Sequence, residues 1–200
     1  MYPFLKRLFD ITASVLGIIL LAPVFIILIL AVKISSPGPA FFRQKRVGRG
    51  KKNFDMLKFR TMRTDAPHDI PTHLLQNPYT YITPIGRFLR RSSLDELPQL
   101  FHILIGDMSV VGPRPALWNQ DDLVAERDKY GANDVRPGLT GFAQIKGRDE
   151  LPINVKAAYD GEYVEKMGLL FDCIIILRTI FSVTRGEGVK EGGKITDLPF

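Results

Sequence analysis

Residues 11–32 read ITASVLGIILLAPVFIILILAV, an uncharged run that lies between Asp10 and Lys33. A helix rises about 1.5 Å per residue, so a run of about 20 apolar residues reaches across the hydrocarbon core of a membrane. The run is too long for the apolar region of a usual secretory signal peptide, and no small-x-small cleavage site follows it. A soluble core helix of this composition would need cover on all sides, which a chain of 200 residues can hardly supply. The stretch therefore predicts a membrane-inserted helix.

Two features favour a re-entrant hairpin over a spanning helix. Pro23 lies in the middle of the run, where a proline removes a backbone hydrogen bond and kinks a helix. Basic residues flank the run on both sides: Lys6 and Arg7 precede it, and residues 33–63 carry ten Lys or Arg against one acid, Asp55. Because positive residues prefer the cytoplasmic side, a hairpin would keep both flanks inside. A spanning helix that contains a proline stays open as the alternative.

The overall composition points to an anionic partner. The net charge is +6 and the pI is about 9.5, which suits nucleic acid, a phosphorylated substrate or an anionic membrane. An apolar fraction of 46% excludes a disordered chain, and the single cysteine, Cys173, excludes a disulfide framework and a Cys-rich zinc site. His68, His73 and His102 lack metal-ligand spacing. Nucleic acid fits less well than the other partners, because no recognition motif is found.

The rest of the chain predicts a predominantly helical α+β fold with a small β-hairpin. Two strand-like runs, residues 41–47 and 53–59, flank a basic, Gly-containing turn and predict the hairpin. Residues 64–84 are rich in turn signals and predict an irregular connection. The expected organisation is a membrane-inserted segment over residues 1–36 followed by one further domain over residues 37–200.

Apolar residues recur at helical spacing from about Ser92 to Ile105 and predict a helix there. Ser93 or Asp95 would be its N-cap, so Asp95 and Glu96 would lie at a helix N-terminus, where the dipole favours negative charge. Further helices are predicted over residues 119–130, 154–167 and 168–183. The last of these is amphipathic and suited to packing or to a membrane interface.

The adjacent acids Asp95 and Glu96 are the first candidate for chemistry. Two carboxylates can share a Mg²⁺ ion with the phosphate oxygens of a substrate. A carboxylate can also attack phosphorus to give an acyl phosphate. Helix capping is the alternative explanation for the pair.

Cations held in rigid loops are the second candidate. Flanking prolines fix the backbone around Arg114, which limits the entropy lost when its guanidinium binds phosphate. Arg136 begins another Pro- and Gly-rich loop, Arg148 ends a third, and Lys58 lies at the end of the predicted hairpin. Each alone could be a solvated charge. Together with the acidic pair they favour a phosphorylated substrate at a bilayer surface.

Several long motifs, in order along the chain, resemble the bacterial sugar transferases, which are monotopic polyprenol-phosphate phosphoglycosyl transferases. The motifs are PAFFRQ (39–44), KFRTM (58–62), SLDELPQL (93–100) and GDMSVVGPRP (106–115), with residues 136–148 as a fifth. The resemblance runs from the N-terminal helix to about residue 185. It corresponds to the minimal catalytic unit of the family, so residues 37–200 would be the catalytic domain.

The resemblance implies transfer of a sugar 1-phosphate from a UDP-sugar to undecaprenyl phosphate, with release of UMP. Family members use Mg²⁺ and a ping-pong mechanism, in which Asp95 would form a covalent phosphosugar. Glu96 would assist by metal ligation or acid–base chemistry, and Arg114 would hold phosphate. Lys58, Arg90, Asp160 and, less closely, Asp172 match positions near the family's active site.

The resemblance also implies a location and leaves alternatives. The family's membrane helix is re-entrant and broken at a Ser-Pro pair, which is Ala22-Pro23 here, so the kink would rest on Pro23. The catalytic domain would lie on the cytoplasmic face of the bacterial inner membrane, against anionic headgroups. A non-catalytic basic membrane scaffold and a Mg²⁺-dependent phosphohydrolase stay open as alternatives. The sugar, the pathway, homo-oligomerisation and contacts with downstream glycosyltransferases are undecided by the sequence.

Overall fold

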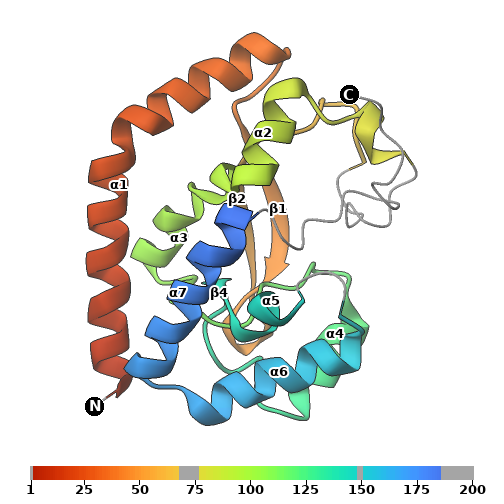
Figure 1. Cartoon of the computed structure of the whole chain (residues 1–200). Helices are drawn as coiled ribbons and strands as arrows, with labels where there is room; N and C mark the ends of the chain where they lie inside the picture. The colour runs from red at the N-terminus through yellow and green to blue at the C-terminus, as the bar shows by residue number, and fades with distance from the viewer. Residues whose placement is uncertain (1, 68–76, 148–150, 186–200) are drawn as a thin grey trace.

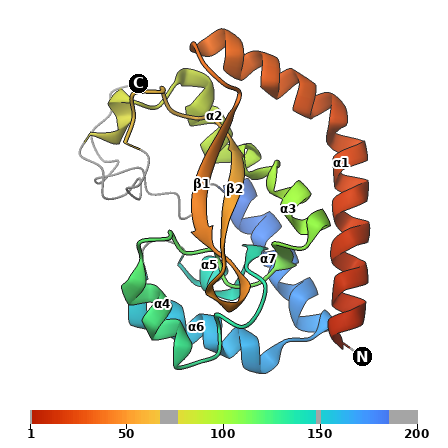
Figure 2. The same cartoon turned by 180° about the vertical axis from the view of Figure 1, so that it is seen from behind.

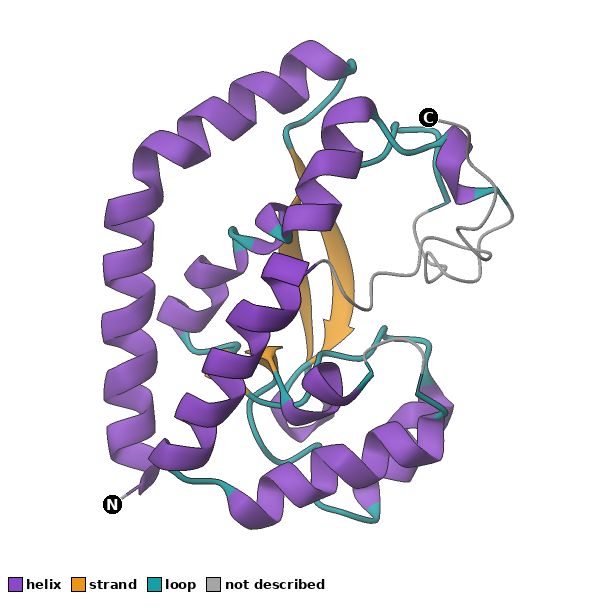
Figure 3. Cartoon of the chain, viewed as in Figure 1, coloured by secondary structure: helices purple, strands orange, loops and turns teal. Residues whose placement is uncertain are grey.

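The computed structural model describes residues 2–67, 77–147 and 151–185 (Figure 1). Helices dominate, as predicted, and the strands are few and short (Figure 3). The elements are α1 (Tyr2–Ser35), β1 (Phe41–Val47), η1 (Arg49–Lys51), β2 (Asn53–Phe59), η3 (Pro78–Thr80), α2 (Pro84–Ser92), η4 (Leu94–Glu96), α3 (Gln99–Ile105), β3 (Ser109–Val111), α4 (Asp121–Asp128), β4 (Gly138–Thr140), α5 (Phe142–Lys146), α6 (Ile153–Lys166) and α7 (Leu169–Arg185).

Helix α1 is one long helix that runs along the side of the molecule and bends between its two halves (Figures 1 and 2). Pro23 lies inside it, and a proline there frees one backbone carbonyl and bends the helix. The helix continues through Ala22 and Pro23, so the structure has a bend where the sequence predicted a break. Within the described residues, α1 is the one helix long and apolar enough to cross a membrane. The re-entrant topology stays a prediction.

One side of α1 packs on the protein and the other is exposed. Phe25, Leu28 and Val32 are buried in a core cluster with Phe59 of β2 and Leu89 of α2. The exposed large apolar residues of α1 and α7 include Phe4, Leu8, Leu16, Ile19, Leu20, Ile26, Ile27, Leu30, Ile34, Leu170, Leu177, Ile180 and Phe181. Exposed apolar patches larger than a few hundred Å² mark interaction surfaces, and this surface agrees with membrane association.

The predicted hairpin is confirmed, with strand bounds that match the sequence prediction. β1 and β2 pair antiparallel, from Phe41 opposite Phe59 to Val47 opposite Asn53. Gly50 at the tip has a φ of 62°, a left-handed conformation that glycine adopts at little cost. The open end of the hairpin lies beside α2 and η4, where Phe59 packs in one cluster with Leu89 and Leu94.

A second, parallel pair of strands, β3 and β4, was not predicted because each strand has only three residues. The two backbones approach closely at Gly112 and Gly138: a Cβ atom added to Gly138 would lie 2.1 Å from the backbone nitrogen of Gly112. Only glycine allows this approach. It fixes the start of the loop that carries Arg114.

The later helices confirm the sequence prediction in α4, α6 and α7, but the helix expected from Ser92 is wrong in its start. Ser92 ends α2 instead, and Ser93 turns the chain with a left-handed φ of 55°. A 3₁₀ turn, η4, follows, and α3 begins only at Gln99, after Pro98 at its N-cap position. The acidic pair therefore lies in its own tight turn before the helix.

Candidate active site

Five of the predicted site residues meet where β2, α2, η4 and the loop after β3 converge. Lys58 is the penultimate residue of β2, and Arg90 lies in the last turn of α2. Asp95 and Glu96 form most of η4, and Arg114 follows β3. Residues separated by as many as 56 positions along the chain are thus brought to one site.

Glu96 is the centre of the ion pairs in this site. The Nζ atom of Lys58 donates to Glu96 Oε1 at 2.7 Å, and Nη2 of Arg114 donates to the same oxygen at 2.8 Å. The side chains of Lys58 and Glu96 are 14% and 15% exposed. Burial alone would raise the pKa of Glu96, but these two cations hold it well below its ordinary value. Burial lowers the pKa of Lys58, and Glu96 opposes that effect.

The pKa of Asp95 is shifted in the opposite direction to that of Glu96. Burial, followed in the same direction by the charge of Glu96, raises the pKa of Asp95 to about 6, although Lys58, Arg90 and Arg114 each act to lower it. When the pKa values of two neighbouring carboxylates move apart, the two groups can take different chemical roles. Glu96 is a permanently charged partner of the two cations. Asp95 is the more basic carboxylate, and it is still ionised at neutral pH.

The local backbone explains why the two acids differ. Successive residues of a 3₁₀ turn point about 120° apart around its axis. Glu96 forms the ion pairs with Lys58 and Arg114, while Asp95 lies close enough to Lys58, Arg90 and Arg114 to feel their charges. Ser93 before the turn and Pro98 after it separate the pair from α2 and α3.

The loop that carries Arg114 is held from both sides. Nη1 of Arg46 on β1 donates to the carbonyl of Pro115 at 3.0 Å, and the amide of Gly138 donates to the carbonyl of Pro113 at 2.9 Å. Arg46 also lies near enough to Lys58 for its charge to lower the pKa of that amine. The sequence analysis missed Arg46. Strand alternation could have found it, because Arg46 lies on the same face of the hairpin as Lys58.

Asp160 is not part of this site. Its carboxylate forms a buried ion pair with Arg127: Nη2 lies 2.6 Å and Nε 2.8 Å from Asp160 Oδ2, and the side chains are 5% and 1% exposed. The pair joins α4 to α6. Burial raises the pKa of Asp160, and Arg127 opposes that effect. The structure thus gives Asp160 a part in packing, away from Lys58 and Glu96.

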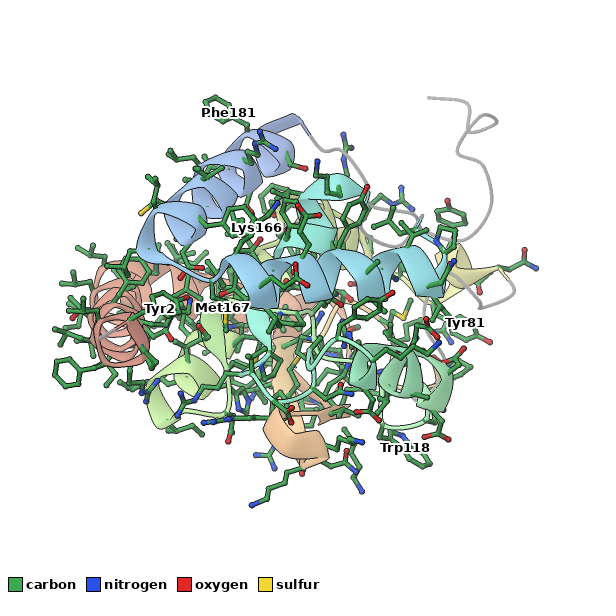
Figure 4. The ribbon with its side chains drawn as sticks, turned by 90° about the horizontal axis from the view of Figure 1, so that it is seen from below. Tyr2, Tyr81, Trp118, Lys166, Met167 and Phe181 are labelled. Carbon is green, nitrogen blue, oxygen red and sulfur yellow. The ribbon has the colours of Figure 1, made fainter. Side chains whose placement is uncertain are left out.

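Asp172 is likewise buried elsewhere. It accepts hydrogen bonds at 3.0 Å from the hydroxyls of Tyr2 and Tyr163, and the Nζ atom of Lys6 lies 2.9 Å from it. Figure 4 shows Tyr2 reaching toward the junction of α6 and α7, near Met167. Asp172 therefore fastens the N-terminal end of α1 to the rest of the fold.

Arg136 lies at the other end of the hairpin from Lys58. Its Nε donates to the carbonyl of Gly106 at 2.8 Å, and burial, with the charges of Arg7 and Arg49, lowers its pKa. Arg49 belongs to the hairpin tip. Arg148 lies outside the described residues, as do His68 and His73.

Comparisons with known proteins agree with the motifs. A family model described as bacterial sugar transferase matches residues 1–186. The exopolysaccharide production protein ExoY of Sinorhizobium fredii is 36% identical over 197 residues, which cover 92% of this chain and 87% of that protein. The UDP-glucose:undecaprenyl-phosphate glucose-1-phosphate transferase of Caulobacter vibrioides is 43% identical over 188 residues, which cover 89% of this chain and 69% of that protein. The UDP-N-acetylgalactosamine-undecaprenyl-phosphate N-acetylgalactosaminephosphotransferase of Aeromonas hydrophila is 34% identical, with 94% and 46% covered.

Proposed function

Because this chain belongs to the bacterial sugar transferase family of enzymes, we propose that it transfers a sugar 1-phosphate from a UDP-sugar to undecaprenyl phosphate and releases UMP. The names of the Caulobacter and Aeromonas relatives support the acceptor, and they give two different donor sugars for those proteins. The observation that carries the proposal is the divided acidic pair. Glu96 is bound by Lys58 and Arg114, while Asp95 keeps a raised pKa beside them.

Asp95 is the proposed nucleophile. Its carboxylate oxygen forms a bond to the sugar-bearing phosphorus of the UDP-sugar, and the bond from that phosphorus to the bridging oxygen breaks, so UMP leaves with the electron pair. A phosphate oxygen of undecaprenyl phosphate then attacks the same phosphorus and returns the carboxylate of Asp95. The products are UMP and the sugar joined to the lipid through a diphosphate. A carboxylate with a pKa of about 6 is ionised at neutral pH and more basic than an ordinary aspartate.

The cations of the site suit two anionic substrates. The site contains three cations, Lys58, Arg90 and Arg114. It contains two carboxylates, Asp95 and Glu96, so one positive charge is in excess. This excess can offset the charge that develops on the transferring phosphoryl group. Glu96 holds Lys58 and Arg114 in place before the substrate arrives, so these groups need little rearrangement during the reaction.

The acidic pair fits the Mg²⁺ ion that the family resemblance implies. Protein-bound Mg²⁺ is usually held by one or two carboxylates together with substrate phosphates and water. Asp95 and Glu96 provide these carboxylates, and the described residues contain no group of three or more metal-ligating side chains that would form a separate cage. Bound there, Mg²⁺ would neutralise charge on the diphosphate. Lys58 and Arg114 act on the same phosphates.

The exposed apolar surface supports a place for the reaction at a membrane. α1 and α7 carry large exposed apolar side chains, and Phe181 of α7 projects outward from the fold (Figure 4). We propose that these helices rest in the inner membrane, with the catalytic domain on the cytoplasmic face. Undecaprenyl phosphate would then meet the site from the lipid, and the UDP-sugar would meet it from water.

The test is UMP release by purified protein in lipid particles, with Mg²⁺, undecaprenyl phosphate and a panel of UDP-sugars. Wild-type protein should release UMP, and Asp95→Asn should not. Asp128→Asn is the matched control and should keep full activity, because it changes an exposed carboxylate at the end of α4 that pairs with Lys51 of the hairpin tip. Steady turnover without the lipid acceptor would identify a phosphohydrolase instead. Folded wild-type protein that releases no UMP from any sugar would support the scaffold alternative.

A further inference from the structure

His102 on α3 forms hydrogen bonds through both ring nitrogens, and none of the proposed steps uses it. The backbone amide of Leu57 on β2 donates to Nε2 at 3.1 Å. Nδ1 lies 3.1 Å from Oδ2 of Asp107. The ring also packs edge-on against Phe54, with centroids 5.4 Å apart, and the side chain is 13% exposed.

These partners fix which nitrogen carries the proton. A backbone amide can only donate, so Nε2 of His102 must accept and must carry no proton. Nδ1 then carries the proton of the neutral ring, and this N–H donates a hydrogen bond to the Asp107 carboxylate. The carboxylate selects the tautomer, and the tautomer makes an acceptor available to Leu57.

The position of this hydrogen bond connects it to the site. β2 pairs with β1 along one edge, and alternate residues of an antiparallel strand turn their amides away from the partner strand. The amide of Leu57 is turned toward α3 and is satisfied there by His102. Leu57 directly precedes Lys58, and His102 lies in the same continuous segment as Glu96. One hydrogen bond thus joins the strand that carries Lys58 to the segment that carries Glu96.

We propose that His102 is a positioning residue for the phosphosugar transfer, and this proposal rests on the proposed function. By accepting the Leu57 amide, His102 holds β2 at the distance at which Lys58 reaches Glu96. Asp107 supports this contact by fixing the ring tautomer. Neither residue needs to touch a substrate.

Two variants of His102 separate positioning from simple packing. The amide oxygen of glutamine falls near the place of Nε2, so His102→Gln keeps an acceptor for Leu57. Leucine fills a similar volume and offers no acceptor. We expect His102→Gln to keep kcat within about threefold, and His102→Leu to lower it on the order of 100-fold, the loss that a displacement of about 1 Å costs at an active site. Thermal unfolding checks that both variants are folded. Equal kcat in the two variants would overturn the proposal.

A second measurement is independent of any activity. In ¹⁵N-histidine-labelled protein, long-range ¹H–¹⁵N spectra distinguish a protonated ring nitrogen from an unprotonated one, and the signals of His102 are assigned by their loss in His102→Gln. We expect a proton on Nδ1 of His102 and none on Nε2, with the preference weakened in Asp107→Ala. A proton on Nε2 would exclude the hydrogen bond from the Leu57 amide and would overturn the proposal, whether or not the enzyme releases UMP. If the wild type releases no UMP while this tautomer is found, the proposed function fails and the hydrogen bond stands.

Discussion

Replacing Asp95 with asparagine should abolish transfer and, at the same time, make the folded protein more stable. The substitution removes the proposed nucleophile and also a carboxylate that is costly to ionise in the folded state. Its pKa of about 6 lies roughly two units above that of an exposed aspartate, and each unit corresponds to about 1.4 kcal/mol. Since Asp95 and Glu96 titrate together, the expected gain at pH 8 is on the order of 1–3 kcal/mol.

The sign of this effect depends on pH. The folded state binds the Asp95 proton more tightly than the unfolded chain does, so ionisation costs stability as pH rises from about 4 to about 6. Above pH 6 the whole cost is present, and below pH 4 it is absent. Asp95→Asn should therefore melt about 2–10 °C above the wild type at pH 8, and at nearly the same temperature at pH 4.

Glu96→Gln is the contrasting variant, because removing this neighbouring carboxylate should lower the stability of the folded protein instead of raising it. Glu96 is ionised and bound by Lys58 and Arg114, and removing the anion from a buried pair costs about 3 kcal/mol. Thermal unfolding of both variants in the same detergent at pH 8, beside UMP release, makes the comparison. A melting temperature of Asp95→Asn below that of the wild type would refute the reasoning, as would substantial UMP release by that variant.

Further expectations follow from the same geometry. The single-turnover rate of UMP release should fall as the pH is lowered and Asp95 takes up a proton, because only the ionised carboxylate can attack phosphorus, and a rate that stays constant down to pH 4 in folded protein would contradict this role. Chelation of divalent ions should stop UMP release, and added Mg²⁺ should restore it; activity that survives EDTA would argue against a metal. Asp160→Asn should lower the free energy of unfolding by about 3 kcal/mol, because it leaves Arg127 buried without its anion, while the KM for the UDP-sugar stays within twofold. Replacing Leu177 and Phe181 of α7 with glutamate should reduce binding to lipid vesicles measured by flotation, and unchanged flotation would show that α7 does not face the lipid.

Elements with a strong local pattern could be predicted from the sequence. The hairpin strands alternate on either side of a Gly-containing turn, and their bounds were confirmed. The apolar run 11–32 falls within α1, and the periodic segments near 119–130 and 154–167 became α4 and α6. In the site, Lys58 and Arg114 were predicted from their places in rigid loops and motifs, and the structure brings both to Glu96.

The remainder depends on tertiary contacts that local patterns do not report. A three-residue strand such as β3 forms only because β4 approaches it through Gly112 and Gly138. An acid in a helix looks the same in the sequence whether it faces a substrate or a buried partner. Asp160 has Arg127 as its partner, and Asp172 has two tyrosines and a lysine.

The buried contacts of α1 connect the membrane helix to the geometry of the site. Asp10 is 1% exposed and accepts hydrogen bonds from the hydroxyl of Ser109 at 3.0 Å and the amide of Val110 at 2.9 Å, both in β3. The loop that carries Arg114 leaves from the end of this strand, and Arg114 reaches Glu96 from there. Buried polar groups lose their stabilisation when their partners move, so α1 cannot slide along the fold without disturbing β3. The helix that would enter the lipid is therefore fixed to the strand that precedes Arg114, the arginine proposed to bind phosphate, and the depth of α1 in a membrane would set the height of the proposed active site.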